Sequence, residues 1–196
     1  MTRTADHAIE AHFIDRWSPR AFDPKPLPEA ELMRLFEAAR WAPSCMNSQP
    51  WRFVYALRDS ADWELFVGLL NEGNRAWAQN ASALVFVGSF TLMGFPGQPP
   101  TMPSPTPNFD TGAAWASLAL QAHAQGLITH GMAGVDFARA KTELGVPDTV
   151  KLEAAIAVGY PGKKEDLPEA LQARENPSPR NPVSSFAFAG RFPSAT

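Results

Sequence analysis

The sequence predicts an α+β fold of mixed helix and strand layers, and three observations support this. Segments with apolar residues at helical spacing alternate with short apolar runs typical of strands. Apolar residues make up 45% and charged residues 19% of the 196 residues, which is ordinary for a folded protein. We find no internal repeat and no clear boundary in composition, so a single domain over residues 1–196 is expected.

The first predicted helix covers residues 28–42. Pro28 suits the first helical position, and apolar residues recur on one face. Pro43 ends this helix, because the residue before a proline avoids the helical region. Residues 43–50 then form a polar loop between prolines, and residues 51–58 are rich in aromatic and β-branched side chains, which is typical of a strand.

The middle of the chain is predicted to contain a helix, a strand and a long loop. Ser60 is expected to cap a helix over residues 61–72. Residues 83–90 form a continuous apolar run, which suits a strand buried on both faces. Residues 91–109 contain many prolines, and a loop of this length is usually functional or a lid.

The next predicted helix, over residues 111–125, is apolar or small on nearly every side. Asp110 is expected to cap it and Gly126 to end it. Such a helix is buried all round, either in the core or at a subunit interface. A strand is expected to follow over residues 127–134.

The last regular elements precede a proline-rich tail over residues 161–196. Asp136 is expected to cap a short helix that ends at Gly145, and residues 151–161 end as a strand. The tail is polar but carries apolar anchors, and it packs either on a partner subunit or on its own chain. These anchors are Phe186, Phe188 and Phe192.

Composition excludes several classes of protein. The net charge of −3 gives no basic excess for binding nucleic acid. The longest apolar stretch, around residues 81–90, is about half the length of a membrane span. The first twelve residues lack the apolar segment of a signal peptide, and the single cysteine, Cys45, cannot form an internal disulfide, so a reducing cytoplasm is expected.

The usual catalytic and nucleotide-binding motifs are absent from the sequence. There is no G-x-G-x-x-G, no phosphate-binding loop with its lysine, and no G-x-S-x-G. No pair of carboxylates is spaced for acid–base chemistry, and we assign no catalytic side chain. The histidines lack metal-site spacing, so no metal site is expected, and His123 is interpreted as a core or interface residue. They are His7, His12, His123 and His130.

Cys45 offers one alternative, a cysteine-dependent hydrolase or transferase. A thiol nucleophile needs an activating base, and His130 is the one histidine that we can propose. Nothing in the sequence places His130 near Cys45. A small neutral residue lining a site is therefore the favoured interpretation of Cys45.

The segment Arg-Trp-Ser-Pro-Arg, residues 16–20, has the composition of an anion clamp. Two guanidinium groups and a hydroxyl lie within five residues, and the guanidinium fork matches phosphate oxygens. Taken alone the pattern is weak, since most such clusters are solvated surface. The motifs that follow this segment in the sequence strengthen its interpretation as a binding site.

Three ordered motifs resemble the FMN-dependent nitroreductase family. Residues 16–22, Arg-Trp-Ser-Pro-Arg-Ala-Phe, match the family pattern R-R-S-x-R-x-F. Residues 39–53 match A-x-x-A-P-S-x-x-N-x-Q-P-W-x-F. The resemblance continues more loosely through residues 110–114 and 126–129 and ends near Arg180.

The resemblance implies a central sheet flanked by helices and a homodimer with an FMN at each end of its interface. The extended tail would wrap the partner subunit. Arg16, Ser18 and Arg180 would hold the FMN phosphate, and Arg20 would lie beside flavin N1 and O2. The other implied cofactor-binding residues are Trp17, Asn74 at the pyrimidine edge, the 131–134 segment near flavin N5 (Gly131, Met132, Ala133, Gly134), and a loop reaching the partner's flavin (Pro43, Ser44, Cys45, Asn47, Gln49).

The chain departs from the family pattern at several positions. Trp77 stands where some members have a lysine near the flavin, and Ser178 where those members have one near the phosphate. Cys45 replaces a common serine. Fewer cations would weaken phosphate binding and could shift the flavin potential.

The activity implied by the resemblance is reduction of electron-poor acceptors such as nitroaromatics, quinones or enals. NADPH or NADH would pass a hydride to flavin N5 in a ping-pong cycle, and the acceptor would then take it from the same face. The 91–109 loop would lie near the active site and govern substrate choice. Alternatives within the family are an aldehyde or enal reductase, a dehalogenase, an oxidase, or an FMN-binding protein with little turnover.

Overall fold

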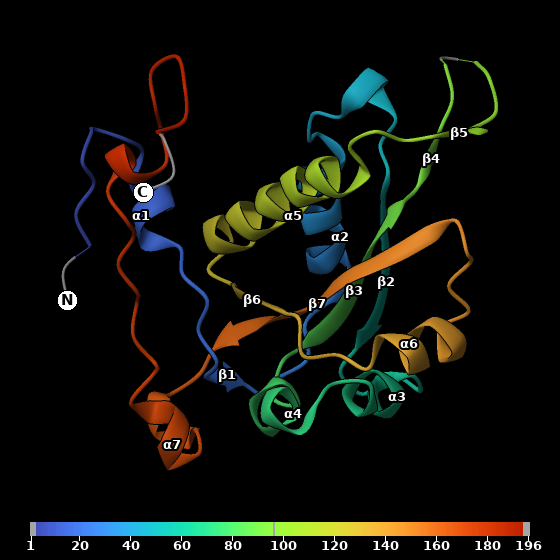
Figure 1. Ribbon diagram of the computed structural model, residues 1–196. Coiled ribbons are helices and arrows are strands. Elements are labelled where there is room, and N and C mark those ends of the chain that lie inside the picture. The colour runs from blue at the N-terminus through green and yellow to red at the C-terminus, as the bar shows by residue number, and fades with distance from the viewer. Residues whose placement is uncertain (1–2, 96, 194–196) are drawn as a thin grey trace.

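The computed structural model describes residues 3–95 and 97–193. Its main feature is a five-stranded sheet in which β7 is central and every pairing is antiparallel. Strand β7 pairs with β3, which pairs with β2, and β7 also pairs with β6 and with the short β1 (Figure 1). These strands are β1 (Phe22–Asp23), β2 (Trp51–Leu57), β3 (Ala83–Phe90), β6 (Ile128–Met132) and β7 (Val150–Pro161).

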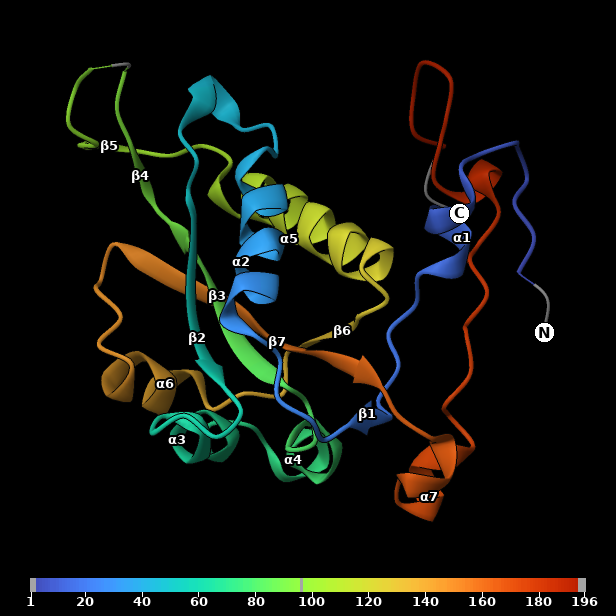
Figure 2. The same ribbon diagram turned by 180° about the vertical axis from the view of Figure 1, so that it is seen from behind.

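Helices cover both faces of the sheet, as Figures 1 and 2 show from opposite sides. Helices α2 and α5 pack on one face, and α3, α4 and α6 pack on the other. This arrangement confirms the predicted α+β class. The helices are α1 (Ala11–Asp15), α2 (Glu29–Arg40), α3 (Trp63–Gly68), α4 (Glu72–Ala78), α5 (Pro107–Ala124), α6 (Phe137–Glu143) and α7 (Glu169–Gln172).

Strand β3 lies at the centre of this core and confirms the prediction of burial on both faces. Leu84 and Phe86 pack toward α3 and α4, where the Phe66 ring meets Phe86 edge-on at 5.3 Å. Val85 and Val87 point the other way, toward α2 and α5. Successive residues alternate between faces, so a continuous apolar run is needed when both faces are covered.

The prediction of one helix over residues 61–72 is wrong, because two short helices occupy this region. Between them, Leu69 and Leu70 are almost fully buried, and the helix ends so that both can enter the core. Asn71 then caps α4 by accepting the backbone N–H of Asn74 at 2.9 Å. Ser60 forms no side-chain cap, since the residue preceding α3 is Asp62.

The 91–109 loop holds more regular structure than the sequence predicts. Strands β4 (Leu92–Met93) and β5 (Met102–Pro103) pair as a small hairpin. Helix α5 begins at Pro107 rather than residue 111, because proline suits a first helical turn. Asp110 therefore lies inside the helix and is not its cap.

The remaining elements follow the predictions closely. Helix α2 and strands β2, β6 and β7 lie within or almost within their predicted ranges. Asp136 caps α6 by accepting the backbone N–H of Arg139 at 3.0 Å. Among the residues that the model describes, no helix combines the length and apolar character needed to cross a membrane.

The two ends of the chain run side by side, apart from the sheet, in both views (Figures 1 and 2). The Asp6 carboxylate accepts the backbone N–H of Val183 at 2.8 Å and joins them. The tail anchors Phe186 and Phe192 are 63% and 87% exposed, and Phe109 on α5 is 79% exposed. A single chain thus covers neither the anchors nor all of α5, and packing on a partner stays a prediction.

Candidate functional site

The Arg16–Arg20 segment connects α1 to β1 in an extended conformation. The Arg16 guanidinium donates to the Trp17 carbonyl at 2.9 Å and to the Ser18 hydroxyl at 3.5 Å. Arg16, Trp17 and Ser18 are all half-buried. Two groups of the predicted anion clamp, the Arg16 guanidinium and the Ser18 hydroxyl, therefore lie side by side.

Two more guanidinium groups, from Arg180 and Arg3, gather near Arg16. Burial lowers the pKa of Arg16, and the positive charges of Arg180 and Arg3 lower it further. Arg3 donates to the Arg16 carbonyl at 3.0 Å. Within residues 3–95 and 97–193, none of these three arginines forms an ion pair with a carboxylate. Like charges held together with no carboxylate at ion-pair distance among the described residues are typical of an anion-binding site.

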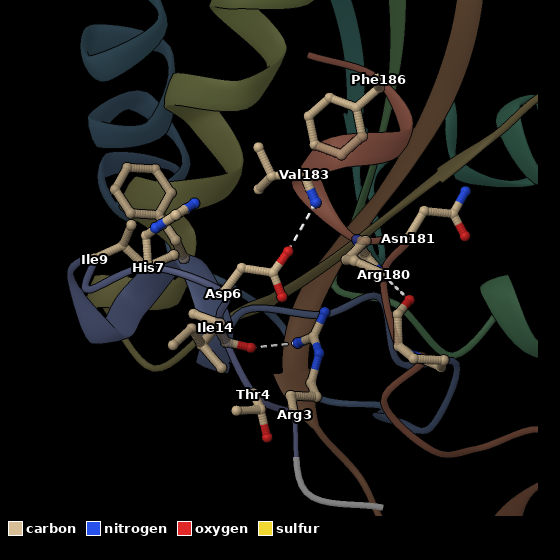
Figure 3. A pocket seen from close by; sticks show the side chains of 13 residues that line it. Arg3, Thr4, Asp6, His7, Ile9, Ile14, Arg180, Asn181, Val183 and Phe186 are labelled. Atoms are coloured by element: carbon tan, nitrogen blue, oxygen red, sulfur yellow. Dashed lines mark hydrogen bonds between the residues drawn. The ribbon is translucent and has the colours of Figure 1, made fainter. Parts of the chain in front are cut away.

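Arg3 was missed in the sequence because a lone arginine near the N-terminus belongs to no motif. It reaches the cluster because the N-terminal segment packs against the tail. Figure 3 shows Arg3 and Arg180 lining one cavity of about 610 Å³ between these two segments. Ser178, at the position of the missing family lysine, accepts from Arg180 at 3.1 Å and adds no charge.

Arg20 is held by a residue that the sequence also did not reveal. Glu175, in the tail after α7, accepts the backbone N–H groups of Arg20 and Ala21 at 2.7 and 2.9 Å. Its second oxygen lies 3.8 Å from the Arg20 guanidinium. A glutamate in a polar tail gives no sequence signal, because this contact joins residues 155 positions apart.

Asn74 lies beside the predicted flavin segment, as the resemblance implies. Its amide donates to the Gly134 carbonyl at 3.1 Å, and the same carbonyl accepts from the backbone of Asn71 at 3.0 Å. Gly131 and Met132 lie in β6, whose pairing among the described residues is with β7 alone. The other edge of β6 thus keeps backbone groups for a ligand.

The polar loop of residues 43–49 forms a second, separate group. No hydrogen bond or ion pair of the described residues joins it to Arg16, Arg20, Asn74 or the 131–134 segment. It lies at the N-terminal end of α5, where the Asp110 carboxylate accepts the backbone N–H of Cys45 at 3.0 Å. The chain therefore divides the predicted cofactor residues into two groups.

The conformation of this loop is strained and internally bonded. Met46, Asn47 and Gln49 have φ of 50°, 54° and 48°, in the left-handed region that non-glycine residues avoid. Ser44 accepts the backbone N–H of Gln49 at 3.0 Å, and the Gln49 amide donates to the Asn47 carbonyl at 3.1 Å. Such strain persists where surrounding contacts enforce it, and it is typical of functional loops.

We expect Asp110→Ala to destabilise the loop and the protein. The buried carboxylate also accepts the Thr106 hydroxyl at 3.2 Å, so its removal leaves two donors unsatisfied. The expected loss in the free energy of unfolding is about 2 kcal/mol, measured by urea denaturation. Asp62→Ala, at an exposed cap without a side-chain hydrogen bond, is the control and should cost less than about 0.5 kcal/mol. Equal losses of unfolding free energy in the two variants would contradict a stabilising role for the Asp110 hydrogen bonds.

The β4–β5 hairpin packs beside the same loop. A cavity of about 320 Å³ lies between them, lined by Met46 and Asn47 from the loop, Arg52 from β2, and Met93 and Phe95 from the hairpin. Burial lowers the pKa of Arg52, whose guanidinium lies over the Phe90 ring at 4.9 Å. The proline-rich segment thus borders a cavity shared with the predicted cofactor loop.

Two other sequence candidates have structural roles. Trp77 is 2% exposed, stacks on Phe22 at 6.1 Å and lies 4.6 Å from the His130 ring. His130 Nδ1 donates to the Pro19 carbonyl at 2.9 Å, and no hydrogen bond between His130 and Cys45 exists in the described chain. Burial lowers the pKa of His130. Among the described residues, His130 is therefore engaged elsewhere and is not hydrogen-bonded to Cys45.

Fold and site together define an α+β protein with a cluster of arginines that form no ion pair among the described residues. A family model described as "Nitroreductase family" matches residues 14–160, and the chain belongs to this family. A solved structure described as an oxidoreductase containing FMN is 49% identical, with a TM-score of 0.93 over 97% of this chain and 96% of that one.

Two curated proteins are similar to most of this chain. An uncharacterized 15.4 kDa protein of Mycolicibacterium smegmatis is 36% identical over 68% of this chain and 88% of its own length. A protein named NADH dehydrogenase, from Thermus thermophilus, is 29% identical over 77% of this chain and 85% of its own length.

Proposed function

We propose that this protein is an FMN-dependent oxidoreductase that uses NADH or NADPH to reduce electron-poor acceptors such as nitroaromatics, quinones or enals. The observation that carries the proposal is the cluster of Arg16, Arg180 and Arg3, three cations without a carboxylate partner among the described residues. A phosphate dianion satisfies such a cluster with charge-assisted hydrogen bonds. The FMN-containing neighbour and the NADH dehydrogenase relative support the same conclusion.

Other predicted site residues offer groups suited to the rest of an FMN molecule. Ser18 adds a hydroxyl beside Arg16, and Asn74 offers an amide for the pyrimidine edge. A Cβ atom at Gly134 would lie 2.6 Å from the Asn74 amide nitrogen, so a side chain there would force the asparagine amides to shift. Glycine thus permits the close approach of the Asn71 and Asn74 side chains to the 131–134 backbone.

FMN, when bound, supplies the acceptance and release of a hydride at its N5 atom. The arginine cluster would hold the phosphate, and Asn74 and the 131–134 backbone would offer hydrogen-bonding groups to the ring. Arg20 places a fixed positive charge that favours the reduced, more negative form of the cofactor. None of these residues transfers a proton in the proposal, and no catalytic side chain is assigned.

We propose that the functional unit is a homodimer. The 43–49 loop is strained and well anchored, yet it makes no bond to the other predicted cofactor residues in the described chain. A second copy would bring this loop, and the cavity beside the β4–β5 hairpin, to the partner's cofactor. The exposed tail anchors would then be covered by the partner.

The experiment that tests the function is the visible absorption spectrum of the purified protein, with and without added FMN, followed by anaerobic NADH or NADPH. A flavin spectrum that bleaches on addition of either nucleotide supports the proposal. Bound flavin that neither reduces would contradict nicotinamide dependence and support an FMN-binding role. A protein that FMN does not titrate would overturn the assignment.

Cys45→Ser is expected to leave reductase turnover within about threefold, a change of under ~1 kcal/mol, because no histidine among the described residues is hydrogen-bonded to the thiol and the two side chains are similar in size. Steady-state oxidation of NADH with an acceptor measures this effect. A cysteine-dependent hydrolase or transferase would instead lose its activity. Loss of turnover with FMN still bound would therefore contradict the flavin mechanism.

A further inference from the structure

Glu175 is a buried carboxylate that the proposed mechanism does not yet use. It belongs to the tail, whose other residues from 176 to 193 are exposed, yet Glu175 itself is only 7% exposed. A charged side chain is rarely buried without a specific partner. Its partners therefore indicate why the tail enters the site at this residue.

The contacts of Glu175 all lead to the Arg20 segment. One carboxylate oxygen accepts the N–H groups of Arg20 and Ala21, at 2.7 and 2.9 Å. The other lies 3.8 Å from the Arg20 guanidinium and has no hydrogen bond. On the other side of the segment, His130 donates to the Pro19 carbonyl at 2.9 Å. The backbone of residues 19–21 is thus fixed by side chains from the tail and from β6.

The negative charge of Glu175 opposes the proposed role of Arg20, which is to favour the reduced flavin through its positive charge. The Arg20 guanidinium is the one cation within ion-pair distance of Glu175 among the described residues. The separation exceeds a hydrogen bond, so the guanidinium keeps its donors for another acceptor. The carboxylate nevertheless reduces the net positive field that Arg20 projects.

We propose that Glu175 is a positioning residue that fixes Arg20 and tunes the reduction potential of the bound flavin. This inference rests on the proposed function. Its backbone bonds hold Arg20 at the cofactor, and its negative charge limits how strongly Arg20 favours the reduced state. The C-terminal tail thereby contributes to redox tuning as well as to packing.

Glu175→Gln tests the proposal, because the amide oxygen still accepts both backbone N–H groups while the charge is lost. We expect the midpoint potential of bound FMN to rise, with affinity for reduced FMN gaining about fivefold over affinity for oxidised FMN. The potential is measured by anaerobic equilibration with a reference dye. Arg20→Gln should shift the potential in the opposite direction, and the effect of Glu175→Gln should shrink when Arg20 is already replaced.

Glu143→Gln is the matched control, since Glu143 also pairs with an arginine, Arg139, but on α6. The midpoint potential of FMN bound to Glu143→Gln should equal that of FMN bound to the unchanged protein. An unchanged potential in Glu175→Gln, with FMN bound and only the stability altered, would reduce Glu175 to a structural role and overturn the inference. Failure of the unchanged protein to bind FMN would instead overturn the proposed function.

Discussion

Arg16→Ala is expected to weaken FMN binding about 100-fold and to leave riboflavin binding almost unchanged. Riboflavin lacks the phosphate, so it reports the contacts to the rest of the flavin and none of those proposed for Arg16 and its neighbours at the phosphate. A charge-assisted hydrogen bond to a dianion is worth about 1.5–3 kcal/mol. The upper part of this range applies because Arg16 is half-buried and lacks a competing carboxylate among the described residues. Titration of flavin fluorescence measures both affinities.

The control for this prediction is Arg34→Ala, which removes an exposed arginine of α2 that already pairs with Glu31 at 3.0 Å. It should change neither affinity. Raising the salt concentration should weaken FMN binding to the unchanged protein more than to Arg16→Ala, since screening acts on the charge that the variant lacks. Equal losses for FMN and riboflavin would mean that Arg16 supports the fold of the site rather than the phosphate.

Gly134→Ala is expected to lower the free energy of unfolding by about 2 kcal/mol and to weaken binding of FMN and riboflavin alike. The added Cβ would lie 2.6 Å from the Asn74 amide nitrogen and would also contact the Asn71 amide. Asn71 caps α4 and Asn74 is proposed to bind the flavin ring, so both must move. Urea denaturation and flavin titration measure the two effects.

Gly73→Ala is the matched control, because Gly73 lies in α4 beside Asn74 and a Cβ there meets nothing closer than 3.9 Å. Alanine favours a helix interior over glycine, so this variant should gain about 0.5–1 kcal/mol. Its flavin affinities should stay unchanged. If Gly134→Ala binds both flavins normally, the Asn74 amide does not contribute to the ring site.

The sequence predicted the elements whose patterns are local. The apolar run of β3 predicted a strand buried on both faces. Pro28 and Pro43 predicted the limits of α2 closely. The break between α3 and α4 escaped the pattern, because Leu69 and Leu70 continue the helical spacing of apolar residues. They leave the helix to fill the core, and only tertiary packing carries that preference.

The sequence by itself determined the family, the α+β class and the identity of most candidate cofactor residues, because these depend on residue types at fixed spacings along the chain. Only the tertiary structure decided that Arg3 joins Arg16 and Arg180, that Glu175 holds Arg20, and that the 43–49 loop stands apart from them. These contacts join residues far apart in sequence. Their existence depends on how the two chain ends pack, and no local pattern encodes that packing.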